Sequence, residues 1–208
     1  MHIPDGFLSP SVFISGWAVA LGFLTYAFRK TQQMLKEKII PLMGVMAAFI
    51  FAAQMLNFPV LGGTSGHLLG GVLAAVTLGP FAASIVISLV LVVQCLIFQD
   101  GGITALGANI FNMAIIGTIA SYYFYRVLRQ ALLKKNILVS VFIAAWFSVV
   151  FAASFCAMEL SLSGVSPLKI VLPAMLFVHV FIGLGEAIIT TLVLSFILKV
   201  RPDLICER

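Results

Sequence analysis

The first two residues of the sequence carry nitrogen atoms whose spacing suits metal chelation. The α-amine of Met1, the backbone nitrogen of His2 and the Nδ1 atom of the His2 imidazole can close two adjacent chelate rings in one plane. The amide nitrogen must lose its proton to bind. Nickel(II) and copper(II) favour square-planar nitrogen sites and can drive this loss, whereas zinc(II) prefers a tetrahedral site. A histidine at position 2 also occurs without any function, so the chelate is a hypothesis here.

A second imidazole could fill the open corner of that plane. The chain has three histidines, and His67 directly follows the glycine-rich stretch Gly62–Gly66, whose backbone can bend. Its tautomer would need a hydrogen-bond partner, for which Ser65, Asn109 and Asp5 are the candidates. The alternative is that His67 only forms hydrogen bonds at a membrane interface. As a ligand, it would complete a set of four nitrogen donors.

The last apolar stretch places four residues on one helical face, because their spacings are four, three and four. They are His179, Gly183, Glu186 and Thr190. Ionisable residues inside a membrane span are candidates for function, so this face could line a transport cavity. It could also hold helices together by buried hydrogen bonds. We favour the second interpretation, because the ionisable residues are expected well below the outer loops.

An intramembrane protease is the alternative from a different class of protein. Gly63-Thr64-Ser65-Gly66 matches the G-x-S-G pattern of rhomboid-like serine proteases, and His179 could be the base that activates Ser65. We find no second histidine on an early helix to build an oxyanion hole. The sequence also has no G-x-x-x-x-G-K-[ST] motif for ATP. We therefore expect no catalytic residue, no bound cofactor and no ATP bound by this chain.

Membrane-spanning helices must position these side chains. Of the 208 residues, 62% are hydrophobic and 9% are charged, and the mean hydropathy is +1.18. A soluble domain carries about 25% charged residues. The apolar runs are continuous rather than alternating, which favours helices over a β-barrel. We predict an all-α polytopic bundle of about seven transmembrane helices, forming a single domain over residues 1–208.

The predicted spans are 10–28, 39–58, 67–79, 80–98, 105–125, 137–158 and 170–198. A helix needs about 20 apolar residues to cross the bilayer, so the third span is too short. The residues before it, Gly62–Gly66, are expected to enter the membrane as non-helical backbone that protein buries or that lines a cavity. The last span is long, so it is expected to tilt or to begin at the interface with Pro173 in its first turns.

The net charge of +5 is distributed between particular spans rather than over a nucleic-acid-binding surface. With seven spans, three basic clusters fall on one side, which the positive-inside rule makes cytoplasmic. We therefore expect the N-terminus outside, the C-terminus in the cytoplasm and no nucleic-acid partner. The clusters are Arg29, Lys30, Lys36 and Lys38; Arg126, Arg129, Lys134 and Lys135; and Lys199, Arg201 and Arg208, with Lys169 alone elsewhere.

The N-terminal amine can act as a ligand only if Met1 is the mature N-terminus. No charged segment precedes an apolar core, as it would in a signal peptide, and His2 is too bulky for the usual removal of the initiator methionine. In the second span, Gly44, Ala48 and Ala52 form a stripe that allows close helix approach. We favour internal packing for this stripe over docking of a partner subunit.

Four stretches, in this order along the chain, carry a resemblance to a known family. They are Met1-His-Ile-Pro-Asp-Gly-Phe-Leu, Gly62-Gly-Thr-Ser-Gly-His-Leu-Leu-Gly, Asp100-Gly-Gly-Ile-Thr-Ala-Leu-Gly-Ala-Asn-Ile-Phe-Asn-Met and His179-Val-Phe-Ile-Gly-Leu-Gly-Glu-Ala-Ile-Ile-Thr. The third stretch is long and specific. With these stretches the sequence resembles the CbiM/NikM family, the metal-specific S-components of energy-coupling factor (ECF) transporters.

The resemblance implies seven helices and an N-terminal segment inserted into the bundle. It implies that Met1 contributes its amine, His2 its amide and imidazole nitrogens, and His67 its imidazole to a nickel(II) or cobalt(II) ion. That ion would be the transported substrate, bound from outside. A square plane of four nitrogens favours nickel(II) over cobalt(II).

The resemblance also implies partners. A transmembrane coupling (T) subunit and two ATP-binding-cassette ATPase subunits would reorient the protein in the membrane. A small accessory membrane subunit is also expected, as a separate chain because this one stops at Arg208. The expected location of this multi-pass protein is the bacterial inner (plasma) membrane.

Overall fold

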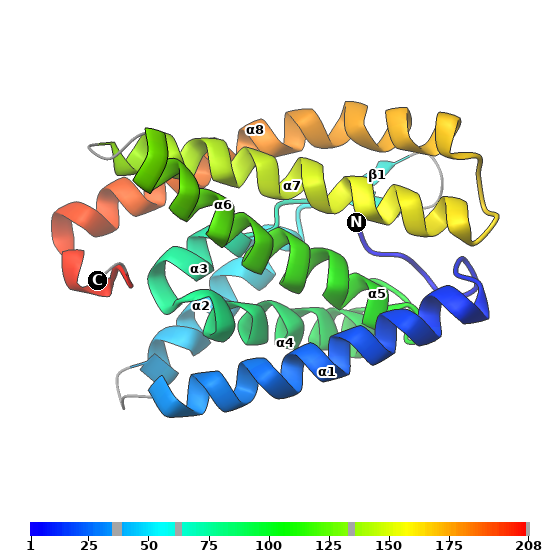
Figure 1. Cartoon of the computed structure of the whole chain (residues 1–208), viewed down its shortest axis with the longest axis horizontal. Helices are drawn as coiled ribbons and strands as arrows, with labels where there is room; N and C mark the ends of the chain where they lie inside the picture. The colour runs from blue at the N-terminus through cyan, green and yellow to red at the C-terminus, as the bar shows by residue number, and fades with distance from the viewer. Residues whose placement is uncertain (35–38, 61–63, 133–135, 207–208) are drawn as a thin grey trace.

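The computed structural model describes residues 1–34, 39–60, 64–132 and 136–206, whose regular secondary structure is helical apart from one short hairpin (Figure 1). The strands β1 (Phe58–Val60) and β2 (Thr64–Gly66) pair antiparallel. The all-α prediction is confirmed, with this hairpin as an addition. The helices are α1 (Pro10–Met34), α2 (Ile39–Gln54), α3 (Gly71–Leu78), α4 (Pro80–Phe98), α5 (Leu106–Ile110), η1 (Phe111–Ala120), α6 (Ser121–Val127), η2 (Leu128–Leu132), α7 (Ile137–Leu162), α8 (Leu168–Val200) and the short η3 (Pro202–Leu204).

Counted over the described residues, seven helical segments lie where the seven spans were predicted. The fifth segment is a succession of α5, η1, α6 and η2, in which α-helical and π-helical stretches alternate over 106–132. Four segments are long and apolar enough to cross a membrane: α1, α4, α7 and α8. The last of these, with 33 residues, holds Pro173 in its second turn. The chain is therefore an integral membrane protein.

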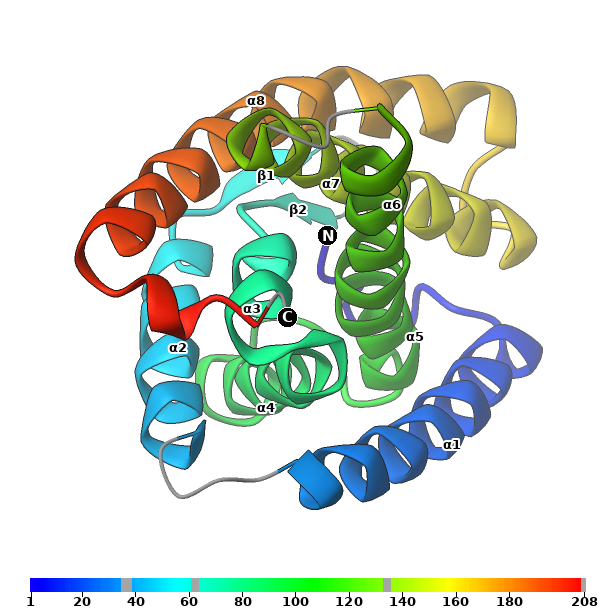
Figure 2. The ribbon, with the colours of Figure 1, turned by 60° about the vertical axis from the view of Figure 1, so that its left-hand side comes forward.

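Helix α3 is the short element at the centre of the bundle. It has eight residues, or about 12 Å of helix, so it cannot cross a bilayer core of about 30 Å. This confirms the prediction for the third span. All its residues are buried, and Figure 2 shows α3 lying among α2, α4, α6 and α8. The preceding residues 64–66 are non-helical, as predicted, while Gly62 and Gly63 lie outside the described residues.

Small residues allow α1 and α5 to cross closely. A Cβ atom added to Gly16 of α1 would lie 2.9 Å from the backbone nitrogen of Ala108, and one added to Gly107 would overlap the backbone nitrogen of Trp17. In lipid, where helices gain little from hydrophobic burial against one another, such close backbone packing supplies much of the association energy. This crossing anchors the loop that contacts the N-terminal segment.

The small-residue stripe of α2 faces outwards instead. Gly44, Ala48 and Ala52 are exposed, and a Cβ atom on Gly44 would meet nothing within 4 Å. The predicted internal packing of this stripe is therefore wrong. Another face of α2 packs against the bundle, and it carries the buried residues Met46, Ile50 and Gln54.

The ends of several helices meet at one end of the bundle, on the left of Figure 1. Thr31 of α1, Ile39 of α2, Arg126 of α6 and Cys206 after η3 line one cavity there. The described basic residues of the three clusters are Arg29, Lys30, Arg126, Arg129, Lys199 and Arg201, all in the closing turns of these helices or just beyond them. Lys36, Lys38, Lys134, Lys135 and Arg208 lie outside the described residues.

Candidate metal site

The N-terminal segment folds into the helical bundle rather than lying on its surface. Met1 and Ile3 have no exposed surface, and His2 is 4% exposed. The backbone of Ile3 is held on both sides. Its N–H donates to Asn109 Oδ1 at 2.9 Å, and its carbonyl accepts from Asn109 Nδ2 at 3.1 Å and from the N–H of Gly102 at 2.9 Å. These bonds fix the position of the two residues before it.

Asp5 fastens the same segment to the loop before α5. Its carboxylate accepts hydrogen bonds from the N–H of Ile103 at 3.1 Å and from the N–H and hydroxyl of Thr104, the N–H at 2.7 Å. The bonds from Thr104 are the main cause that lowers the pKa of Asp5. Gly102 is required beside it, because an added Cβ atom would overlap the backbone nitrogen of Asp5.

Three nitrogen atoms of the first two residues converge on one hydroxyl group. Ser65 Oγ lies 3.3 Å from the Met1 amine, 3.3 Å from the His2 backbone nitrogen and 3.4 Å from His2 Nδ1. The Met1 amine also donates to the Ser65 carbonyl. Ser65 Oγ is therefore nearly equidistant from the three nitrogens and accepts from the first two.

The imidazoles of His2 and His67 each have one ring nitrogen within hydrogen-bond distance of an oxygen on a neighbouring residue. His2 Nε2 lies 3.1 Å from Gln94 Oε1, and His67 Nδ1 lies 2.7 Å from the carbonyl of Leu68. The Leu68 carbonyl is an acceptor, so His67 Nδ1 carries the proton and the lone pair remains on His67 Nε2. His2 has an acceptor at each ring nitrogen, and binding a metal through Nδ1 requires the tautomer that donates from Nε2 to Gln94 Oε1. His67 Nε2 is buried with no partner, and His2 Nδ1 lies 3.3 Å from Asp100 Oδ1.

Burial keeps these donors neutral. It lowers the pKa of the Met1 amine to about 5 and that of His2 to about 3, and it also lowers the pKa of His67. The first two precede α1 and the third lies in the loop before α3, so none belongs to a membrane-spanning helix. At neutral pH all three groups therefore present lone pairs rather than positive charges.

The structure thus brings Met1, His2 and His67 together, as the sequence analysis expected. Among the described residues, no group of three or more His, Cys, Asp or Glu side chains could hold a metal ion. Gln94 was missed from the sequence. Its signal is a polar residue within the otherwise apolar stretch of α4.

The expected partners of His67 are wrong. Ser65, Asn109 and Asp5 bind the N-terminal segment or its loop, while His67 uses the Leu68 carbonyl next to it in the chain. A neighbouring carbonyl can fix the tautomer as well as a side chain does.

Glu186 confirms the interpretation that the polar face of α8 holds elements together. Its buried carboxylate accepts from the N–H of Leu69 at 2.9 Å and from the N–H of Gly70 at 2.8 Å. These bonds tie α8 to the loop that carries His67. For His179 the interpretation is wrong among the described residues, because Nδ1 bonds the Met175 carbonyl of the same helix at 2.8 Å and Nε2 has no partner.

The serine and histidine of the protease alternative do not form a dyad. The hydrogen bonds of Ser65 Oγ go to Met1 and His2, and none joins it to His179 in the described part of the chain. A hydrogen bond from the nucleophile to its base is the expected signature of such a dyad. Gly63 of the motif lies outside the described residues.

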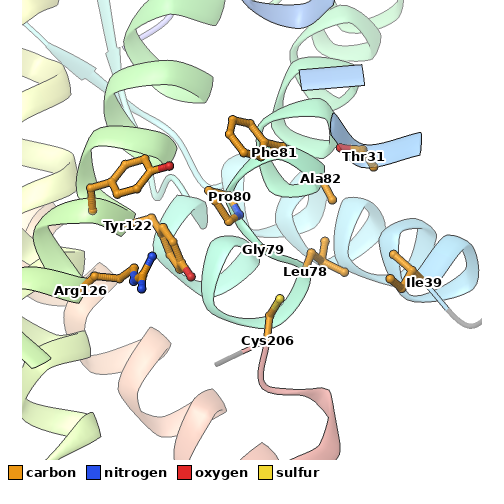
Figure 3. Close-up of a pocket in the computed structure, with 11 residues that line it drawn as sticks. Thr31, Ile39, Leu78, Gly79, Pro80, Phe81, Ala82, Tyr122, Arg126 and Cys206 are labelled. Carbon is orange, nitrogen blue, oxygen red and sulfur yellow. The ribbon is translucent and has the colours of Figure 1, made fainter. Parts of the chain in front are cut away.

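Two cavities differ in their relation to these donors. One, of about 400 Å³, lies beside His67 and Leu68 and is walled by Ile182 and Gly185 of α8. The other, of about 310 Å³, lies at the opposite end of α3, where Figure 3 shows Tyr122, Arg126 and Cys206 around it. Its described lining has no carboxylate or imidazole, so only the first cavity adjoins the nitrogen donors.

Comparison with known proteins assigns the chain to a family. Residues 2–204 match the family model CbiM, described as the cobalt uptake substrate-specific transmembrane region. The chain belongs to the CbiM/NikM family of transition-metal transporter S-components. This is a family of transport proteins and not of enzymes.

Relatives and a solved structure agree with this assignment. An Archaeoglobus fulgidus protein, a candidate fused nickel transport protein NikMN, is 44% identical over 100% of this chain and 69% of its own length. The fused nickel transport protein NikMN of Rhodobacter capsulatus is 34% identical over 100% of this chain and 65% of its own length. A crystal structure of a truncated transition metal transporter superposes with a TM-score of 0.90 at 40% identity, covering 96% of this chain and 99% of the other.

Proposed function

We propose that this chain, acting as one membrane domain over residues 1–208, binds nickel(II) or cobalt(II) from outside the cell in a plane of four nitrogens. The donors are the Met1 amine, the deprotonated His2 amide, His2 Nδ1 and His67 Nε2. The observation that carries the proposal is the convergence of the first three nitrogens, each 3.3–3.4 Å from Ser65 Oγ. The ion would take the place of the hydrogen bonds that the Met1 amine and the His2 N–H now donate to this hydroxyl.

The spacing of the two imidazole rings supports the fourth donor. The open corner of the plane is adjacent to His2 Nδ1, because the His2 amide binds between the amine and the ring. Imidazoles at adjacent corners, with metal–nitrogen distances of about 2.0 Å, have ring centroids about 4.4 Å apart. The centroids of His2 and His67 are 4.5 Å apart, and their planes differ by 26°.

We favour nickel(II) as the substrate over cobalt(II). Four nitrogens in one plane, one of them a deprotonated amide, suit nickel(II) well, and copper(II) also fits this geometry. The relatives point both ways, since some carry nickel in their names and a Methanosphaerula palustris relative, 33% identical, is named for cobalt transport. Zinc(II) is disfavoured by its preference for tetrahedral sites.

Uptake would require partners, because the sequence holds no ATP-binding motif. We infer a transmembrane coupling (T) subunit, two ATP-binding-cassette ATPase subunits and a small accessory membrane subunit, as in ECF transporters. The outward stripe Gly44, Ala48 and Ala52 is available for helix docking. The N-terminus would lie outside and the basic helix ends in the cytoplasm, in the plasma membrane of a prokaryote.

The test uses an N-terminal extension that a site-specific protease can remove to leave Met1 as the first residue. Purified native, extended and cleaved protein are titrated with nickel(II), cobalt(II) and zinc(II) by calorimetry. The extension blocks the amine but keeps both imidazoles. We expect tight binding by native protein, loss on extension and recovery on cleavage. Equal binding by extended and native protein would remove Met1 from the ligand set, and no binding by native protein would contradict the proposed function.

A further inference from the structure

The chain has three histidines, and the proposed plane needs only two of them. His179 of α8 is fully buried. Its Nδ1 donates to the Met175 carbonyl at 2.8 Å, so its lone pair is on Nε2, which has no hydrogen-bond partner. His67 shows the same arrangement, with Nδ1 bound to a carbonyl and Nε2 open. A buried polar atom without a partner calls for a physical explanation.

His179 faces the site and not the lipid. It shares one helical face with the buried residues Met175, Gly183 and Glu186. Helix α8 contacts β2, the strand that ends just before His67, and Glu186 on the same face bonds the N–H groups of Leu69 and Gly70 just after His67. Phe177 and Phe181, on the other face, are exposed.

Packing between helices does not account for the open nitrogen. Helices α7 and α8 are already joined by the hydrogen bond from Trp146 Nε1 to the Val180 carbonyl at 3.2 Å. Trp146 also lies against Gly183, where an added Cβ atom would be 3.1 Å from it. Glu186 makes the bonds that hold the loop after His67. None of these contacts uses His179 Nε2.

We propose that His179 Nε2 is a fifth ligand, which binds the metal transiently as the ion enters or leaves the plane formed by Met1, His2 and His67. This inference rests on the proposed function. A square-planar ion has an open axial position on each face, and the lone pair of His179 Nε2 would approach one of them. No proton moves in this step, since the proton stays on Nδ1, and the metal remains divalent.

A transient ligand changes rates rather than affinity. A fifth donor stabilises the state through which square-planar ions exchange ligands, and it lowers the barrier equally for binding and for release. His179→Gln keeps an amide that can donate to the Met175 carbonyl but removes the imidazole. We therefore expect the association and release rates to fall together by about tenfold or more, with Kd unchanged.

The experiment compares native protein with H179Q and with Thr191→Val. Thr191 is a matched control, because it lies on the same helix and its buried hydroxyl also has no partner. Kd for nickel(II) is measured by calorimetry. The release rate is measured by stopped-flow mixing of the nickel-loaded protein with excess EDTA, and thermal unfolding checks the fold. If H179Q does not fold, His179→Asn, with a smaller amide, replaces it.

Slow exchange at unchanged Kd in H179Q, with native rates in T191V, would support the transient ligand. Native exchange rates in H179Q would overturn it. A tenfold or greater loss of affinity with faster release would also overturn it, because His179 would then be a permanent ligand or a support of the plane. Failure of native protein to bind nickel(II) would contradict the proposed function instead, so the two failures are distinguishable.

Discussion

At the scale of the residue, the candidate site depends on which nitrogen of each imidazole carries the proton. The Leu68 carbonyl accepts from His67 Nδ1, so His67 Nε2 keeps its lone pair, and Gln94 Oε1 is placed to accept from His2 Nε2 when Nδ1 binds a metal. The same buried position lowers the pKa of the Met1 amine to about 5. Deprotonating the amine at neutral pH therefore needs little free energy, and only the His2 amide must lose a proton.

The first prediction concerns Gln94. Gln94→Met removes the acceptor for His2 Nε2 while keeping the volume of a long side chain in a fully buried position. Loss of a partner that orients a ligand lowers metal affinity by about 10–100-fold, and we expect a loss in this range for nickel(II), measured by calorimetry. The exposed Gln33 of α1 provides the control, Gln33→Met. Native affinity in Gln94→Met would show that the tautomer of His2 is not set by this bond.

At the scale of the element, short irregular segments position the donors and the long helices hold those segments. The N-terminal segment is bound to the loop before α5 through Asp5 and to α5 itself through Asn109, and α8 holds the loop before α3 through Glu186. Backbone N–H groups inside a membrane protein need such acceptors. Hydrogen bonds from helix side chains and from one loop therefore position the donors.

The second prediction concerns the attachment of the N-terminal segment. Asp5→Ala removes the acceptor of three hydrogen bonds from Ile103 and Thr104. The amine of Met1 is then less well pre-organised, and we expect nickel(II) affinity to fall by about tenfold with little change in the thermal midpoint. The control is Asp203→Ala, an exposed carboxylate that pairs with Arg201 at the far end of α8. Equal effects of the two variants on affinity would contradict this role.

The third prediction concerns Glu186. Glu186→Ala leaves the buried N–H groups of Leu69 and Gly70 without an acceptor, which costs about 1–3 kcal/mol for each group. We expect metal-free protein to unfold at a clearly lower temperature in detergent, with Glu186→Gln, which keeps one acceptor oxygen, in between. If the alanine variant melted with the native protein, the loop before α3 would have to be held by other contacts.

At the scale of the whole molecule, the site and the basic helix ends lie at opposite ends of α3. His67 precedes the first turn of this helix, and the cavity with Arg126 and Cys206 adjoins Leu78 at its last turn (Figure 3). All residues of α3 are buried, so the helix fills the space between the two ends. An ion bound near His67 is thus separated from the opposite end by packed protein, and its release there requires a rearrangement of the bundle.

The fourth prediction concerns orientation. Cys206 is exposed, whereas Cys95 and Cys156 are buried, so a membrane-impermeant maleimide reports on Cys206. If the basic helix ends are cytoplasmic, Cys206 is labelled only after the membrane is opened. Ser11→Cys in a Cys206→Ser background places a thiol at the exposed start of α1, and we expect labelling in intact cells. Labelling of Cys206 in intact cells would reverse the proposed orientation.

The sequence by itself determined the helices, because a helix in lipid satisfies its own backbone and needs only a continuous apolar run. The predicted spans therefore lie where α1 to α8 lie, and the shortness of α3 was visible in residues 67–79. The donor atoms of Met1, His2 and His67 were also visible, since chelation by neighbouring residues is a local property. The ligand role of these residues stays a prediction.

Only the tertiary structure decided which groups surround those donors. His2 lies against Gln94 of α4, His179 Nε2 of α8 has no hydrogen-bond partner, and the stripe of Gly44, Ala48 and Ala52 faces outwards. Each depends on how helices distant in sequence rotate and pack against one another. The apolar composition that places a helix in lipid leaves its rotation open, so the residue pairs across the site follow from the packed bundle alone.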